Sequence, residues 1–183
     1  IRSKCFVMGN GVSYGDPGWM LRAGLDLTTI AQYQTIIQSE VQTRQIRSSE
    51  GRLVGWQPMW WPAETANFLT TVTERPVWLA TSYFLAWPWR RVAVPAVEEK
   101  VYLAEGVANG ASPIVNLSGG PPAVHEDKRG FAGIQSLYEF MEENDEYLSG
   151  DCSLADVALV FSRNSLAYGF NAEPETYLAA VRG

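Results

Sequence analysis

The stretch PVWLATSYFLAWPWRRVAVPAVEEKVYLAEGVANGASPIVNL, residues 76–117, holds two apolar runs separated by a segment with helical spacing. The runs, residues 77–81 and 113–117, have the length of β-strands. Pro95 begins the segment between them and Gly110 ends it, as expected of a helix. Its apolar residues recur at helical spacing and are predicted to share one face: Val97, Val101, Ala104 and Ala108. The stretch therefore predicts a strand–helix–strand unit.

The same alternation extends over the rest of the chain. Further strands are expected at residues 5–8, 35–41 and 157–161. Further helices are expected from residue 28 and over residues 62–73, 131–148 and 174–181. Residues 44–61 show no clear period and are expected to form a long loop. Strands that alternate with helices are typical of a parallel sheet, so the sequence predicts an α/β fold.

Two arrangements of these units fit the pattern. One is a small doubly wound domain, and the other is half of a (β/α)8 barrel that continues into another domain. A break at Ser149-Gly150-Asp151 separates residues 1–150 from residues 151–183. In both arrangements the polar residues at the carboxyl ends of the strands gather where ligands bind. Strand 113–117 is nearly all apolar and is expected to be buried on both faces.

The composition excludes several classes of partner. The 183 residues carry a net charge of −6, which argues against nucleic acid because no basic excess is present to neutralise phosphates. No apolar run approaches the length of a membrane span, so no membrane contact is expected. Cys5 and Cys152 fit no metal or redox spacing, and free thiols favour a cytoplasmic location. Seven Trp and eight Tyr are typical of clefts whose flat rings stack on sugars.

Glu40 is the leading candidate for a reactive residue, because it ends an apolar strand. Inside a cleft it would be a general acid, a base or an anchor for sugar hydroxyls. At an ordinary strand end it would form a salt bridge with the nearby Arg44. The other residues expected to bind substrate are Asn10, Arg44, Tyr83, Trp87, Arg90, Asn116, His125 and Asp127. Trp87 and Arg90 fit either a sugar subsite or a packed loop.

No metal and no cofactor are expected. His125-Glu126-Asp127 lacks the spacing of metal ligands, and adjacent side chains on an extended segment point apart. His125 is instead expected to hydrogen-bond at the rim of a cleft, while Asp127 binds substrate or caps the next helix. Gly119-Gly120 belongs to no phosphate-binding motif, and the chain has no G-x-S-x-G nucleophile elbow.

The order of these motifs resembles the second half of the catalytic barrel in glycoside hydrolases similar to family 42 β-galactosidases, especially the related hypothetical glycosyl hydrolases. The matching pieces are Glu40-Val41-Gln42-Thr43-Arg44, Pro76-Val77-Trp78, Ala108-Asn109-Gly110-Ala111, the loop from Asn116 to His125, and Asp156-Val157-Ala158-Leu159-Val160-Phe161-Ser162. The resemblance implies that residues 1–150 are the C-terminal half of a (β/α)8 TIM-type barrel. It also implies that residues 151–183 begin a flavodoxin-like domain through which the protein forms a homotrimer.

The resemblance also assigns roles within the site. Glu40 matches an acidic residue that lines the family's site, and His125 matches a histidine that contacts substrate. The family's nucleophilic glutamate follows the seventh strand, where this chain has Ala80-Thr81-Ser82-Tyr83. The implied function is hydrolysis of a glycosidic bond. The family's acid/base glutamate follows the fourth barrel strand, and within this chain Glu40 is the best candidate for an acid/base. A non-catalytic carbohydrate-binding or scaffolding relative is the alternative, and a small α/β domain for another ligand is a third.

Overall fold

The computed structural model describes most of the chain. The described residues are 5–11, 20, 23–42, 45–47, 52–85, 91–117, 120–148, 153–160 and 162. The helix expected at 174–181 lies outside these residues. So do Arg44, Trp87 and Arg90, which are expected to bind substrate.

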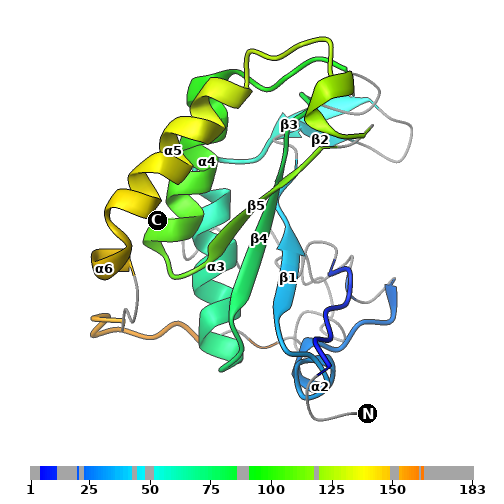
Figure 1. Ribbon diagram of the computed structural model, residues 1–183. Coiled ribbons are helices and arrows are strands. Elements are labelled where there is room, and N and C mark those ends of the chain that lie inside the picture. Colours follow the sequence, from blue (N-terminus) through cyan, green and yellow to red (C-terminus); the bar gives the residue numbers. More distant parts are fainter. Residues whose placement is uncertain are drawn as a thin grey trace.

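A parallel sheet of three strands lies at the centre of the described structure (Figure 1). The strands are β1 (Ile37–Glu40), β4 (Val77–Ser82) and β5 (Ser112–Asn116), and they lie in the order β1-β4-β5. Glu40 lies opposite Ala80, and Ser82 lies opposite Asn116. The sheet confirms the predicted α/β fold and the strands expected at 35–41, 77–81 and 113–117.

Helices cover one face of this sheet (Figure 1). They are α3 (Trp61–Val72), α4 (Ala96–Ala108) and α5 (Phe131–Glu143). Pro62 lies in the first turn of α3, where its missing N–H leaves no hydrogen bond unmade. Gly110 follows α4 with a φ of 82°, the left-handed conformation predicted for it. The helix expected to reach residue 148 is divided at Asn144, after which α6 (Asp145–Leu148) follows.

Residues 44–61 are not the single long loop that was predicted. They contain an antiparallel pair, β2 (Gln45–Arg47) and β3 (Leu53–Trp56). The alternation typical of a strand does not reveal this pair, because the strands are short and the register shifts at Ile46/Arg47. The remaining elements are the short helix α2 (Leu27–Ala31) and the 3-10 turn η1 (Pro122–Val124). Asp26 caps α2, since its carboxylate accepts a hydrogen bond from the Thr28 N–H at 3.0 Å.

The main core lies between the sheet and the helices. Strand residues that point toward the helices are buried there together with Ala66 and Leu69 of α3. The strand members of this cluster are Ile37, Val77 and Leu79. Gly106 lets α4 approach closely, because a Cβ at this position would lie 3.0 Å from Leu79 Cδ2. This contact fixes α4 against the central strand.

The apolar residues predicted to share one face of α4 are not the residues that this helix buries. Val97 is 72% exposed and Ala108 is also exposed, whereas the buried residues are Glu99, Tyr102, Leu103 and Gly106. Both sets have helical spacing, so periodicity alone does not choose between them. The buried set contains a carboxylate, a residue type that is rarely buried, and it was therefore not recognised.

The other corrections concern three strands. Residues 5–8 form no strand, although the Thr35 N–H donates to the Val7 carbonyl at 2.7 Å. Residues 157–160 also form no strand, and Val157 is 87% exposed because no described strand lies beside it. Strand β5 is only half-buried rather than buried on both faces, since it is an edge of the described sheet. None of the helices in the described part of the chain has the length and apolar composition needed to cross a lipid bilayer.

Candidate functional site

The two faces of β4 have different surroundings at its carboxyl end. Thr81 points toward the helices, where its hydroxyl donates to the carboxyl group of Glu99 in α4 at 2.5 Å. Side chains alternate along a strand, so Ser82 points to the opposite face, which we call the open face. Residues in register across a parallel sheet share a face. Asn116, opposite Ser82, and Glu40, opposite Ala80, therefore also belong to the open face.

Glu40 occupies the carboxyl end of β1 on this open face. Its side chain is half-buried, and this burial raises the pKa of its carboxyl group. The next residue, Val41, continues the pairing with β4 by donating its N–H to the Ala80 carbonyl at 2.8 Å. The strand therefore holds Glu40 firmly in position. A carboxyl group with a raised pKa is suited to proton transfer.

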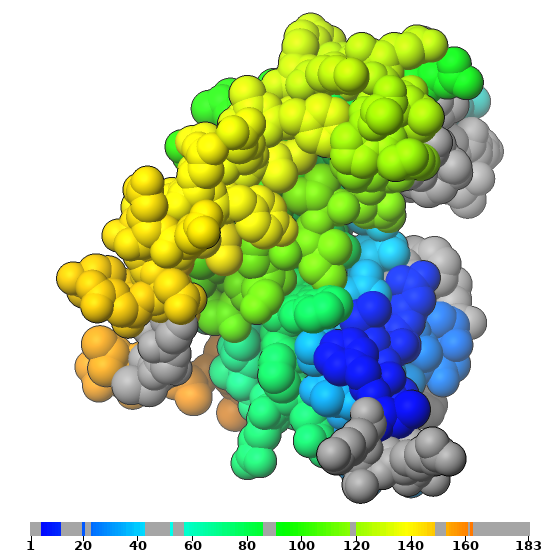
Figure 2. Space-filling model, in the orientation of Figure 1, coloured from blue at the N-terminus to red at the C-terminus, as the bar shows by residue number. Residues whose placement is uncertain are grey.

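Ser82 and Asn116 extend the polar edge across β4 and β5. Ser82 is 1% exposed, and among the described residues none offers a hydrogen-bond partner to its hydroxyl. Asn116 is half-buried, and its backbone carbonyl accepts a hydrogen bond from the Tyr83 N–H at 3.1 Å. Three adjacent strand ends thus place a carboxyl, a hydroxyl and an amide on the same face. The surface is hollowed beside the carboxyl end of β1, below residues 120–130 (Figure 2).

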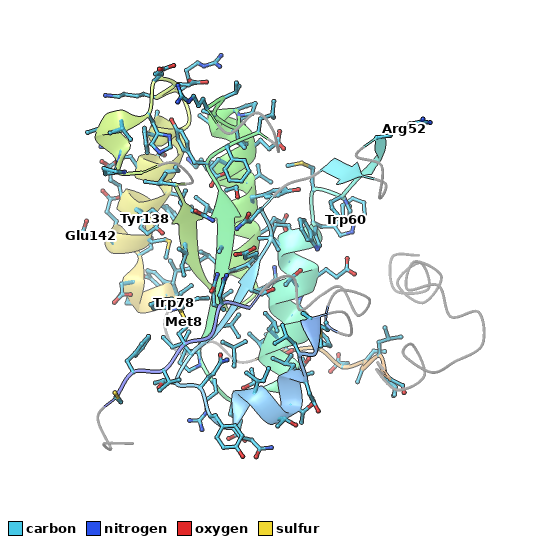
Figure 3. All side chains as sticks on the ribbon, turned by 90° about the vertical axis from the view of Figure 1, so that its right-hand side faces the viewer. Met8, Arg52, Trp60, Trp78, Tyr138 and Glu142 are labelled. Atoms are coloured by element: carbon cyan, nitrogen blue, oxygen red, sulfur yellow. The ribbon has the colours of Figure 1, made fainter. Side chains whose placement is uncertain are left out.

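The amino half of the open face is covered by the start of the chain. The ring of Phe6 lies 5.8 Å from that of Trp78, measured between centroids, and residues 5–10 cross the sheet here (Figure 3). Asn10 is exposed and follows Gly9, whose backbone lies against the Gln34 side chain ahead of β1. Residues 5–10 therefore cover the amino half of the open face, and the polar residues at the strand ends lie on its carboxyl half.

Tyr83, His125 and Phe131 form a cluster of packed rings that follows the carboxyl ends of β4 and β5. Tyr83 is 2% exposed, and its ring stacks on Phe131 with centroids 4.3 Å apart. The rings of His125 and Tyr83 pack in a T-shaped arrangement with centroids 5.1 Å apart. The His125 Nε2 lies 3.1 Å from the Gly120 carbonyl oxygen. His125 is only 9% exposed. Tyr83 and His125 were both expected to contact substrate, and the structure places them in the packing of the loop that follows β5.

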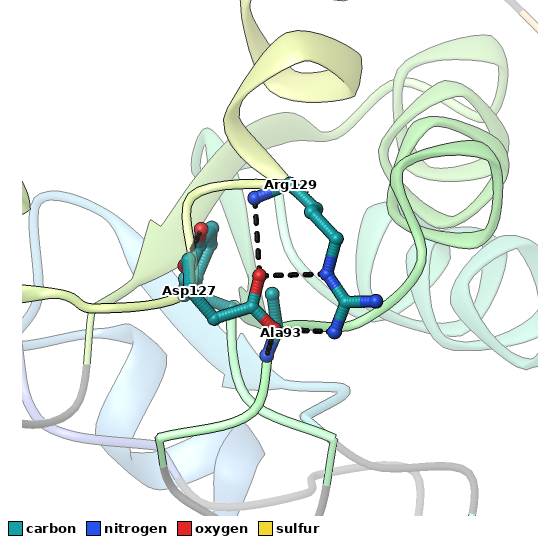
Figure 4. A network of polar contacts seen from close by, with 4 residues as sticks. Ala93, Asp127 and Arg129 are labelled. Atoms are coloured by element: carbon teal, nitrogen blue, oxygen red, sulfur yellow. Dashed lines mark hydrogen bonds and ion pairs between the residues drawn. The ribbon is translucent and has the colours of Figure 1, made fainter.

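Asp127 connects the two loops that follow β4 and β5 (Figure 4). Its carboxylate accepts hydrogen bonds from the Ala93 N–H at 3.0 Å and from the Arg129 guanidinium at 2.7 and 2.8 Å. Its backbone carbonyl accepts a hydrogen bond from the Tyr83 hydroxyl. Arg129 holds the pKa of the Asp127 carboxyl well below its usual range. The structure thus gives Asp127 partners within the protein, whereas substrate contact or helix capping had been expected.

Glu99 is a polar residue that sequence reasoning missed. It is 2% exposed on the helix side of the sheet, and burial raises the pKa of its carboxyl group to about 7. The sequence signal was present, because Glu99, Tyr102, Leu103 and Gly106 follow helical spacing. Recognising it required accepting a buried carboxylate with Thr81 as its partner. Glu99 does not lie on the open face, so it is not part of the strand-end group.

The site contains polar and ionisable groups but no metal centre in its described part. Among the described residues, no group of three or more His, Cys, Asp or Glu side chains is arranged to hold a metal ion. Comparison of the chain with protein-family models, with curated proteins and with solved structures finds no match.

Proposed function

We propose that the open face binds carbohydrate, and that the chain is the C-terminal part of a (β/α)8 barrel of the glycoside hydrolase type. The observation that carries this proposal is the set of Glu40, Ser82 and Asn116 at three adjacent strand ends. In barrels, ligands bind at the carboxyl ends of the strands. A carboxyl, a hydroxyl and an amide match the hydroxyl groups of sugars, which both donate and accept hydrogen bonds.

The sheet order is compatible with a barrel, and equally with one half of a doubly wound domain. The strands follow one another in the order β1-β4-β5, and their connecting helices lie on one face. A doubly wound sheet reverses its strand order and carries helices on both faces, whereas a barrel adds strands in one direction with all helices outside. In a complete barrel, the open face would be turned toward the interior.

Glu40 is the proposed acid/base, and its raised pKa supports proton donation. Glycosidases use two carboxyl groups, about 5–5.5 Å apart in retaining enzymes and about 6.5–9.5 Å apart in inverting ones. Asp127 is bound by Arg129, and Glu126 lies on the surface 3.6 Å from Arg91. Neither is the second carboxyl group in this proposal, which places that group in barrel strands beyond this sequence.

The alternative is a carbohydrate-binding or scaffolding protein without turnover. This alternative is favoured by the residues at the end of β4. Thr81 and Ser82 stand there, at the position where the family that the sequence resembles has its nucleophilic glutamate. The flavodoxin-like character of residues 151–183, trimer formation and a cytoplasmic location stay predictions.

A Glu40→Gln variant tests the role of Glu40. In the full-length protein we expect hydrolysis of 4-nitrophenyl glycosides to fall at least about 100-fold, because general acid–base catalysis contributes that much. Glu126→Gln is the control, since the Glu126 side chain is 78% exposed. Unchanged turnover by Glu40→Gln would exclude Glu40 as the acid/base. Sugar binding by the parent without turnover would favour the binding alternative.

A further inference from the structure

Ser82 occupies the middle of the polar edge on the open face. It belongs to the central strand, β4, with Asn116 on one neighbouring strand and Glu40 on the other. Parallel strands lie about 4.8 Å apart and rise about 3.3 Å per residue. Because Glu40 is level with Ala80 and Asn116 with Ser82, their backbones are separated by roughly 12 Å. Ser82 lies on the strand between them, level with Asn116 and two residues beyond the level of Glu40.

The Ser82 hydroxyl lacks the hydrogen bond that a buried hydroxyl normally makes. Its side chain is buried, and among the described residues none bonds to it. Burying a hydroxyl without a partner destabilises a protein, so an unpartnered serine is a cost unless something outside the protein bonds to it. The flanking Glu40 and Asn116 side chains are half-buried, so each is partly exposed to solvent.

We propose that Ser82 is the floor of a subsite for a single neutral sugar ring between Glu40 and Asn116, in which its hydroxyl bonds to a ligand hydroxyl. This inference rests on the proposed carbohydrate function and adds a specific contact to it. A serine hydroxyl donates one hydrogen bond and accepts others, as a sugar hydroxyl does. The contact would therefore select for a hydroxyl at one position of the ring.

A pair of variants tests this contact against a matched control. Ser82→Ala removes the hydroxyl from the open face. Thr65→Val removes another buried hydroxyl with no described partner, from the helix side of the sheet, and keeps the side-chain shape. The ligands are methyl β-D-galactopyranoside and methyl β-D-glucopyranoside, titrated into the full-length protein by calorimetry. Thermal unfolding of each ligand-free variant is measured in parallel.

We expect Ser82→Ala to weaken binding of at least one of these sugars about fivefold to tenfold, the effect of one lost hydrogen bond. Its unfolding temperature should stay equal to that of the parent or rise, because no protein partner is lost. Thr65→Val should behave alike in unfolding but bind both sugars as the parent does. Weaker sugar binding by both variants would contradict a direct contact between the Ser82 hydroxyl and the ligand.

The outcomes separate this inference from the proposed function. If Ser82→Ala binds sugar as tightly as the parent while Glu40→Gln binds more weakly, the Ser82 contact is wrong and the carbohydrate function stands. If the parent binds neither sugar, both proposals fail. If Ser82→Ala clearly lowers the unfolding temperature, its hydroxyl has a partner in the protein and the inference is wrong.

Discussion

Replacement of Glu99 by Gln should change how the stability of the protein depends on pH. Glu99 is 2% exposed between α4 and the sheet, and its partner is the Thr81 hydroxyl at 2.5 Å. Burial raises the pKa of Glu99 from 4.5 to about 7, while the Thr81 hydrogen bond acts in the opposite direction and only partly offsets it. The folded protein therefore prefers the neutral carboxyl group.

The sign of the pH effect follows from proton binding. Between pH 4.5 and 7 the folded state holds a proton on Glu99 that the unfolded state has released, so the free energy of unfolding falls as the pH rises. The stabilisation is complete below pH 4.5 and is lost once the pH exceeds about 7. Each unit of pKa is worth about 1.4 kcal/mol, so the loss is about 3 kcal/mol over this window.

Urea unfolding followed by tryptophan fluorescence, from pH 4.5 to 8.5, measures this loss. Glu99→Gln keeps the size and polarity of the side chain but cannot ionise. The free energy of unfolding of this variant should therefore exceed that of the parent by up to about 3 kcal/mol above pH 7, and the difference should shrink toward pH 4.5. Glu142→Gln, at an exposed position of α5, is the control and should follow the parent. Equal pH slopes for the parent and Glu99→Gln would refute the reasoning.

Two further predictions concern the loops and helices around the site. Gly133→Ala should destabilise the protein by roughly 1–3 kcal/mol in urea unfolding, because its Cβ would lie 2.2 Å from the Ala96 carbonyl oxygen and force α5 from α4; stability equal to that of the parent would contradict this close packing. Asp127→Asn should lower the unfolding temperature at neutral pH, where the carboxylate holds Arg129 and the Ala93 N–H. Because the pKa of Asp127 is lowered, its stabilisation is present above the ordinary carboxyl range and lost in acid, so the difference between the two proteins should shrink as the pH falls below about 4. A difference that is constant with pH would show that charge does not hold these loops together.

The parts of the fold that could be predicted are those marked by turn residues. Pro62 lies in the first turn of α3 and Gly110 follows the end of α4, and the apolar runs between such turn residues correspond to the strands of the sheet. The pair β2–β3 was missed because its strands, three and four residues long, are too short to show a period. The strand expected at residues 157–161 was wrong over 157–160 for the opposite reason. Its apolar residues are typical of a strand, but a strand also needs a neighbour with which to pair.

The sequence predicted which residues of the candidate site lie at strand ends, but not how these residues are arranged relative to one another. Glu40 and Asn116 follow apolar runs, which placed them at the carboxyl edge of the sheet. Their shared face could not be predicted, because it depends on the register of three strands. The role of Asp127 could not be predicted either, since its partner Ala93 lies 34 residues away in the sequence and offers only a backbone N–H.

The carboxyl end of β4 combines buried polar residues on both of its faces. Thr81 bonds to the Glu99 carboxyl group, whose pKa is raised by burial, and Ser82 has no described partner. The same strand buries Val77 and Leu79 in the apolar core at its other end. Stability alone would favour apolar residues throughout a central strand, because a buried hydroxyl gains nothing over a methyl group unless it is hydrogen-bonded. Sequences depart from such local rules mainly at functional sites. The change from apolar to polar along β4 therefore supports, independently of any resemblance, the proposal that ligands bind at the carboxyl end of the sheet.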